Sequence, residues 1–104
     1  MANKYHANMD SQRRSAKERA RAVELRLLER AGKISGLSEQ VRFQIIEKQE
    51  GEQAAFYIAD FTYWENGEFV VEDVKGYRKG TAYQLFVLKR KLMLKNYNIR
   101  IRET

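Results

Sequence analysis

The chain has 104 residues and a formal net charge of +6, from 20 Lys and Arg against 14 Asp and Glu, and it contains neither cysteine nor proline. The lack of cysteine excludes disulfide frameworks, thiol catalysis and cysteine-based zinc sites, and it fits a reducing cytosol. Because no apolar run reaches the roughly 18 residues of a membrane span and residues 1–10 lack the apolar stretch of a secretory signal, we expect a soluble, cytoplasmic protein without membrane contact, whose charge attracts nucleic acid.

The first part of the chain predicts an N-terminal arm followed by a helix. Residues 1–10 show no periodic pattern, which indicates a mobile arm outside the folded domain. Residues 11–31 are rich in Ala, Leu, Arg and Glu and contain no helix breaker. They predict a helix with Ser11 as its N-cap and Gly32 after its last turn.

The apolar residues of this helix form two stripes. Val23 and Leu27 belong to one stripe, whereas Leu25 and Leu28 lie toward the other side. A helix that is apolar on two sides can pack against its own sheet with one stripe and against another surface with the other. We therefore expect a partner on the second stripe, and a second copy of the chain is one candidate.

The rest of the chain predicts strands, a hairpin and a second helix. After a connection that contains Gly and Ser, β-branched and aromatic residues predict three strands, and a basic loop precedes an amphipathic helix capped by Thr81. The order α-β-β-β-α-β over residues 11–104 predicts one α+β domain with helices against a small mixed sheet. The expected bounds are 32–38 for the connection, 40–48, 54–64 and 68–75 for the strands, 50–53 for the first turn, 76–80 for the basic loop, 81–97 for the helix and 99–102 for a last short strand.

The second and third strands each carry one aspartate, and the turn between them sets their pairing. Asn-Gly at 66–67 is a strong signal for a two-residue hairpin turn, and this turn places Asp60 directly opposite Asp73. Their Cβ atoms are then expected about 5 Å apart on one face, which Lys75 shares. Glu72 points to the opposite face in this register and would replace Asp73 only after a slip of one residue.

Two opposed carboxylates repel one another unless a cation lies between them. Oxygen ligands at this spacing suit Mg²⁺ or Mn²⁺, and an adjacent lysine can hold a hydroxide or a phosphate oxygen. Asp60, Asp73 and Lys75 therefore indicate metal-assisted hydrolysis of a phosphodiester, with Glu18 from the first helix able to complete the carboxylate cluster. The structural alternative places Asp60 at a bent strand end and leaves Asp73 and Lys75 as solvent-facing residues of an edge.

At these residues the chain resembles the PD-(D/E)XK nuclease superfamily, whose signature is an Asp on one strand followed by D/E-x-K on the next. Asp60 matches the first position and Asp73-Val74-Lys75 match the second, while Ala59 stands where the pattern has proline. The stretches NKYHA, KERARAVELRLLERAGKI, EQVRF, YIADF and VEDVKG also resemble a small phage-encoded endonuclease family related to the Holliday junction resolvases. The resemblance covers nearly the whole chain and implies a restriction-endonuclease-like αβββαβ core.

The resemblance also implies roles for individual residues. Glu18 becomes the helical acid of the active site, with Gln40 as its neighbour. A metal ion is ligated by Glu18 and the two aspartates, helped by the Val74 carbonyl, and Lys75 handles the attacking water. The implied activity is that of a Mg²⁺- or Mn²⁺-dependent DNA endonuclease that is selective for branched DNA. Because a junction must be cut on two strands, a homodimer with two sites is favoured.

The basic residues of the chain divide into a loop pair and groups on both helices. Arg78 and Lys79 follow the D-x-K strand at once, so they are the expected phosphate contacts, together with Arg14 and Lys17 of the first helix. Most other helix charges are expected to solvate an outer face.

Two further groups of residues can be interpreted in more than one way. Lys89 and Lys91 of the second helix cannot share one helical face, so at most one of them points at the site. Tyr57, Tyr63 and Trp64 are expected in the core or at an interface rather than as platforms for base stacking.

Two other classes of function remain open. A non-catalytic nucleic-acid-binding module that retains the fold would keep the basic groups and would not need the carboxylates. A small basic structural protein of a virion should gain no stability from divalent ions, whereas a metal site should raise the melting temperature when Mn²⁺ is added.

Overall fold

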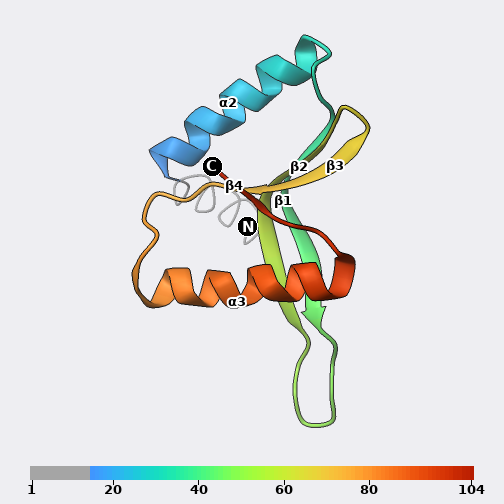
Figure 1. The fold of residues 1–104 in the computed structure, drawn as a ribbon, viewed down its shortest axis with the longest axis vertical. Coiled ribbons are helices and arrows are strands. Elements are labelled where there is room, and N and C mark those ends of the chain that lie inside the picture. Colours follow the sequence, from blue (N-terminus) through green and yellow to red (C-terminus); the bar gives the residue numbers. More distant parts are fainter. Residues whose placement is uncertain (1–14) are drawn as a thin grey trace, which may run out of the picture.

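The computed structural model describes residues 15–104, and within them two helices lie on opposite faces of a four-stranded sheet (Figure 1). The strands stand in the order β1-β2-β3-β4; the first two pairings are antiparallel and the last is parallel. This arrangement confirms the predicted α+β class with an αβββαβ order. The elements are α2 (Ala16–Arg30), β1 (Ser35–Ile46), β2 (Ala55–Glu65), β3 (Glu68–Asp73), α3 (Gly80–Tyr97) and β4 (Arg102–Glu103).

The β2–β3 hairpin has the register that the Asn-Gly turn predicts. Asn66 and Gly67 both have positive φ, 52° and 79°, as a two-residue turn of this kind requires. The pairs run without a shift from Glu65 opposite Glu68 to Phe61 opposite Glu72. The ladder therefore stops one pair before the two aspartates.

Strand β2 changes the face that it buries at Asp60. Tyr57 and Ala59 pack with residues of α3, whereas Phe61 and Tyr63 pack with residues of α2. Alternate residues of a regular strand share one face, so the strand must twist between Ala59 and Phe61. Asp60 lies at this crossing, between the two cores.

The neighbouring strand is kinked at the same level. On β1, Val41 pairs with Ala59 and Glu39 with Phe61, so Gln40 lies beside Asp60. Gln40 has φ of 55°, a left-handed conformation that costs a residue other than glycine about 1–2 kcal/mol. The strain and the change of face coincide, as is common where a strand pair re-aims its side chains.

Two hydrophobic cores result, one beneath each helix. The core under α2 lies against the hairpin end of β2 and β3, and the core under α3 lies against the other half of β2. The first contains Ala22, Leu25, Ile34, Phe61, Tyr63 and Val70, and the second contains Ile45, Tyr57, Ala59, Val71, Phe86, Met93 and Ile101.

Helix α2 begins later than predicted. Ser15 is its N-cap, with an extended backbone and a side chain that accepts a hydrogen bond from the Glu18 N–H at 3.1 Å. This Ser-x-x-Glu spacing is a stronger start signal than Ser11 offers, and residues 1–14, with the expected arm and Ser11, lie outside the described residues. The predicted end is confirmed, because Gly32 has φ of 76° and donates to the Glu29 carbonyl in the manner of a glycine helix stop.

Other predicted bounds also need correction. Strand β1 starts at Ser35, inside the segment expected as a connection, because a register shift and the left-handed Gly36 (φ 62°) interrupt its pattern. Helix α3 starts at Gly80 with Lys79 as its N-cap, so Thr81 is not the cap. The last strand covers only 102–103. Within the part of the chain that the structure describes, no helix has both the length and the apolarity to span a membrane.

Candidate active site

Asp60 and Asp73 meet where β2 and β3 come to the end of their pairing. The Asp60 carboxylate reaches the residue that follows β3, because its Oδ2 accepts a hydrogen bond from the Val74 N–H at 2.8 Å. Asp73 is buried; its Oδ1 accepts a hydrogen bond from the Tyr57 hydroxyl at 3.0 Å, and its Oδ2 lies 2.5 Å from Lys75 Nζ. The D-x-K residues are therefore built around the predicted aspartate pair rather than left on a solvent-facing edge.

The electrostatics of Asp60 show the strain of this placement. Burial raises the pKa of Asp60 to about 6, and the negative charge of Asp73 adds to the increase. Glu18 raises this pKa further, while the Val74 N–H and the charge of Lys75 act in the opposite direction. Asp60 is thus a carboxylate that would gain from a nearby positive charge.

Lys75 is held in position by an aromatic ring of α3, by Asp73 and by the residue that follows β4. Its ammonium lies 3.7 Å from the centre of the Phe86 ring of α3, in addition to its contact with Asp73. The Lys75 N–H donates to the Thr104 carbonyl at 3.0 Å, and the Thr104 N–H donates to the Asp73 carbonyl at 3.0 Å. The backbone of the D-x-K segment is therefore fixed by the segment that follows β4.

Glu18 and Gln40 are neighbours, as expected. The Gln40 side chain donates from Nε2 to Glu18 Oε2 at 3.1 Å, which connects α2 to the kink in β1. Glu18 is close enough to Asp60 to influence its pKa. Within residues 15–104, however, no three side chains among His, Cys, Asp and Glu are gathered as a metal-binding group. The three carboxylates of Glu18, Asp60 and Asp73 therefore do not converge on a single metal position, contrary to what the sequence predicts.

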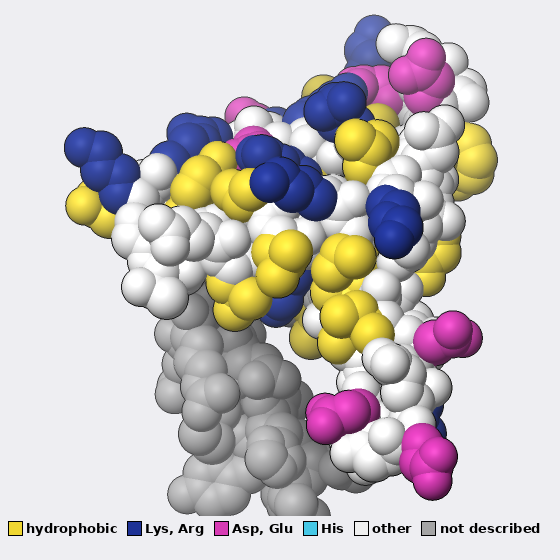
Figure 2. Space-filling model, turned by 60° about the horizontal axis from the view of Figure 1, so that its bottom comes forward, with side chains coloured by type: hydrophobic (Ala, Val, Ile, Leu, Met, Phe, Trp, Pro, Cys, Tyr) yellow, Lys and Arg dark blue, Asp and Glu magenta, His cyan; other side chains and the backbone are white. Residues whose placement is uncertain are grey.

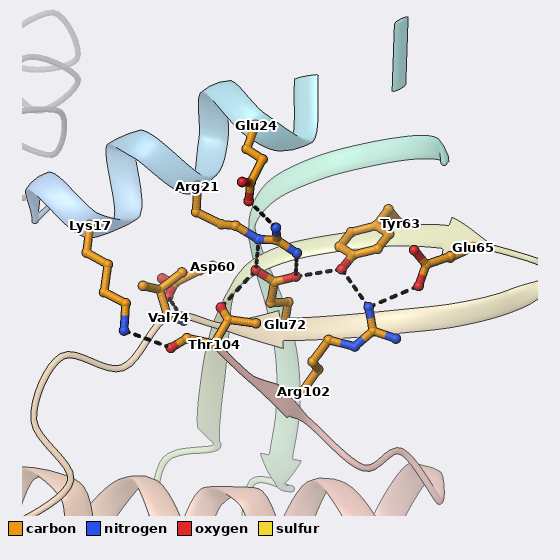
Figure 3. A network of polar contacts seen from close by, with 10 residues as sticks. All are labelled: Lys17, Arg21, Glu24, Asp60, Tyr63, Glu65, Glu72, Val74, Arg102 and Thr104. Atoms are coloured by element: carbon orange, nitrogen blue, oxygen red, sulfur yellow. Dashed lines mark hydrogen bonds and ion pairs between the residues drawn. The ribbon is translucent and has the colours of Figure 1, made fainter. Parts of the chain in front are cut away.

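Glu72 points toward α2, as the register predicts, and its network of polar contacts meets the D-x-K segment at Thr104 (Figure 3). Its side chain is fully buried and accepts hydrogen bonds from Arg21, from the Tyr63 hydroxyl at 2.5 Å and from Thr104 Oγ1 at 3.0 Å. Burial acts to raise the pKa of Glu72, but the hydrogen bonds from Arg21 and Tyr63 outweigh it, and the pKa is lowered. Glu72 therefore contributes to structure and does not replace Asp73.

The predicted phosphate contacts lie in different surroundings. Arg78 forms an ion pair with Glu103 at 3.6 Å, and it lines a groove of about 460 Å³ together with Lys79 at the start of α3. Lys17 donates from Nζ to the carbonyls of Lys75 at 2.7 Å and Thr104 at 3.2 Å, so it fixes the D-x-K segment. Arg14 lies outside the described residues.

Two residues that sequence reasoning did not assign to the site also lie there. Tyr57 is a core aromatic as expected, but its hydroxyl holds Asp73, and only the change of face at Asp60 brings the two together. Lys89 lines a groove beside Asp73 and Lys75, whereas Lys91 does not. The helical spacing could have shown that Lys89, and not Lys91, faces the site, because Lys89 lies one turn after the buried Phe86.

Residues 2–103 match the model of the family described as "Protein of unknown function (DUF1064)". No curated protein and no solved structure gives a significant match. The family description names no activity.

Proposed function

We propose, for a chain that belongs to the family described as "Protein of unknown function (DUF1064)", the activity of a Mg²⁺- or Mn²⁺-dependent DNA endonuclease that prefers branched DNA. One observation carries the proposal. Asp60 and Asp73 converge beside Lys75, and the pKa of Asp60 is raised to about 6 by burial and by the charge of Asp73. Two carboxylates held this close together repel one another and lower the stability of the fold. A cation that binds both of them would offset this repulsion.

The residues present fit such a cation. Mg²⁺ prefers oxygen ligands, is often bound by only one or two carboxylates, and keeps several water molecules. Asp60 and Asp73 supply two carboxylates, and the Val74 carbonyl follows directly on the chain. A third carboxylate in direct contact is therefore not required, and Glu18 would orient the attacking water from α2.

Each side chain has a definable role in hydrolysis. When bound, the metal ion supplies positive charge that lowers the pKa of a water molecule and stabilises charge on the phosphate. Lys75, beside Asp73, would donate a hydrogen bond to the attacking water or to a phosphate oxygen. Tyr57 orients Asp73 through its hydroxyl, and Gln40 orients Glu18.

The charge of the protein supports DNA as the substrate. The net charge of +6 attracts a polyanion. Arg78 and Lys79 follow Lys75 within four residues, so they are available for phosphates on either side of the scissile bond. Lys17, in the first turn of α2, would extend this surface. The ion pair of Arg78 with Glu103 is half exposed and can open for a phosphate at small cost.

An apolar surface on α2 supports a homodimer. Leu25 is buried beneath the helix, while Val23 and Leu27 are 54% and 57% exposed. The two predicted stripes are thus separated, one in the core and one on the surface. A second copy that covers Val23 and Leu27 would give the assembly two sites, as paired cleavage of a junction requires.

One observation favours a second candidate, a non-catalytic module that binds nucleic acid. Lys75 already neutralises Asp73 at 2.5 Å, and Lys17 is bonded to the backbone of the same segment. In that case the aspartates stabilise the fold, and the basic surface alone binds the ligand. Such a module would bind DNA equally well with or without divalent ions.

Cleavage of a labelled four-way DNA junction and of its matching linear duplex, with Mg²⁺ or Mn²⁺, distinguishes the two candidates. Asp73→Asn keeps the size of the side chain and removes its charge, and Glu68→Gln, at the exposed hairpin end, is the matched control. We expect metal-dependent paired nicking of the junction by the wild type and by Glu68→Gln, and loss of at least about a hundredfold in rate for Asp73→Asn. Binding without cleavage would contradict the endonuclease and leave the binding module.

A further inference from the structure

A small groove opens beside Asp73 and Lys75, between the end of β3 and helix α3. It has a volume of about 210 Å³, and its lining includes Ile58, Leu85, Phe86 and Lys89. Figure 2 shows the face of the molecule over α3, where apolar side chains lie interleaved with Lys and Arg. The groove thus combines charged and apolar walls next to the aspartate of the candidate site.

Lys89 is the charged wall of this groove. It is half-buried on α3, one turn after the buried Phe86 and one turn before the buried Met93. Lys75, its neighbour in the groove, is already bound to Asp73. Among residues 15–104 the structure gives Lys89 no ion-pair or hydrogen-bond partner. A cationic side chain that lines a groove and has no partner there favours an anionic ligand.

The apolar walls restrict the kind of anion. Ile58 and Leu85 are 52% and 53% exposed, although both line the groove. A free phosphate would gain nothing from these walls. A nucleotide matches both halves of the groove, because its phosphate can contact Lys89 while one face of its base covers the two aliphatic side chains.

The size of the groove limits the number of bases that it can hold. Pockets for drug-sized ligands are usually about 300–1,000 Å³, and this groove has about 210 Å³. A single base can enter, but a base pair cannot, and the face of a base is accessible only when it is unpaired and unstacked. We infer that the groove binds one unpaired nucleotide next to the scissile phosphate, with Lys89 on its phosphate and Ile58 and Leu85 on its base.

Binding without metal tests the groove separately from cleavage. The probe is a short fluorescein-labelled oligothymidylate, measured by fluorescence anisotropy in EDTA over a series of salt concentrations. We expect Lys89→Gln to weaken binding about tenfold and to reduce the salt slope by about one. The matched control is Lys91→Gln, an exposed lysine of the same helix outside the groove lining, which should change binding less than twofold. Equal effects of the two substitutions would overturn the role of Lys89.

The base contact needs a second probe. Ile58→Ser with Leu85→Ser should weaken binding of oligothymidylate about tenfold and leave binding of an abasic strand of the same length unchanged. Leu88→Ser, 54% exposed on α3 but outside the groove lining, should change neither. Equal losses on both strands, or equal affinity of the wild type for the oligonucleotide and a blunt duplex, would overturn the unpaired nucleotide. Thermal melting verifies that each variant is folded.

This inference depends on the proposed function only for the position of the scissile phosphate, and the two can fail separately. If the wild type never cleaves DNA but Lys89→Gln and the serine pair weaken binding as expected, the endonuclease is wrong and the nucleotide groove stands. If the wild type cleaves a junction but Lys89→Gln behaves like Lys91→Gln, the groove is wrong and the endonuclease stands.

Discussion

Arg21 and Glu72 join α2 to β3 through two parallel hydrogen bonds: Nε lies 2.6 Å from Oε2, and Nη2 lies 2.9 Å from Oε1. Glu72 has no solvent-exposed surface, and Arg21 is one helical turn after Glu18. The bond from Glu72 raises the pKa of Arg21 far above its usual range, although burial acts against the increase. This pair therefore fixes the distance between the helix that carries Glu18 and the strand that carries Asp73.

Removal of Arg21 should destabilise the protein strongly. Arg21→Met keeps the aliphatic packing but leaves the Glu72 charge buried with only hydroxyl partners, so we expect a loss of about 3 kcal/mol in the free energy of unfolding. The measurement is urea unfolding at pH 7. Arg26→Met, which breaks the more exposed pair with Glu39 on the same helix, is the control and should cost less than about 1 kcal/mol. Similar losses for both variants would show that Glu72 does not need its partner.

The lowered pKa of Glu72 sets a pH dependence. Since the folded protein holds this proton less tightly than the unfolded chain, whose value is about 4.5, the contribution of Glu72 is complete above that pH and is lost as the pH falls through the folded pKa. Acid unfolding monitored by circular dichroism should therefore show Glu72→Gln to be less stable than the wild type at pH 7. The difference in stability between the two proteins should become smaller below pH 4.5. A constant difference over the whole range would exclude this linkage.

Asp60 should show the opposite dependence in the metal-free protein. Its folded pKa of about 6 exceeds its ordinary value of 3.8, so the ionised carboxylate lowers stability progressively as the pH rises from about 4 to about 6. Asp60→Asn should therefore be more stable than the wild type at pH 7 and equal to it below pH 4. Thermal melting in EDTA measures the effect.

Divalent ions should reverse the order of stability of the wild type and Asp60→Asn. A cation that binds the folded wild type but not the unfolded chain raises its melting temperature as the cation concentration exceeds the dissociation constant, and Asp60→Asn removes one ligand. We expect Mn²⁺ to raise the melting temperature of the wild type by several degrees and that of Asp60→Asn hardly at all. If the wild type fails to respond to Mg²⁺ and Mn²⁺ at millimolar concentration, the metal site is wrong.

The hairpin explains how much of this site could be predicted. The Asn-Gly turn at 66–67 is a local signal, and it correctly placed Phe61 opposite Glu72 and Glu72 on the face away from Asp73. The D-x-K spacing likewise brought Lys75 to Asp73. These relations depend on residues close together in the sequence, where turn geometry and strand alternation decide the outcome.

The crossing at Asp60 could not be predicted in the same way. Strict alternation would give Tyr57 and Phe61 the same face, but they belong to different cores, and the change of face occurs beside the left-handed Gln40 of the neighbouring strand. A glutamine gives no local sign of that conformation. The contacts of Tyr57 with Asp73 and of Lys17 with the D-x-K segment follow from tertiary packing and were missed for the same reason.

Gln40 allows strain and function to be separated by one substitution. Gln40→Gly removes the side chain that donates to Glu18 and relieves the strain of φ at 55°, so we expect stability to be unchanged or to rise by up to about 1 kcal/mol. The same variant removes the Gln40 contact that orients Glu18, so junction cleavage should fall by about tenfold or more if Glu18 acts in the site. In Gln40→Asn the new asparagine tolerates the left-handed backbone but is too short to reach Glu18 in the same way, so this variant should behave like Gln40→Gly in cleavage.

Urea unfolding and single-turnover cleavage of the junction measure the two effects. A variant that loses stability and activity together would show that Gln40 serves the fold alone, whereas full activity in both variants would remove Glu18 from the mechanism.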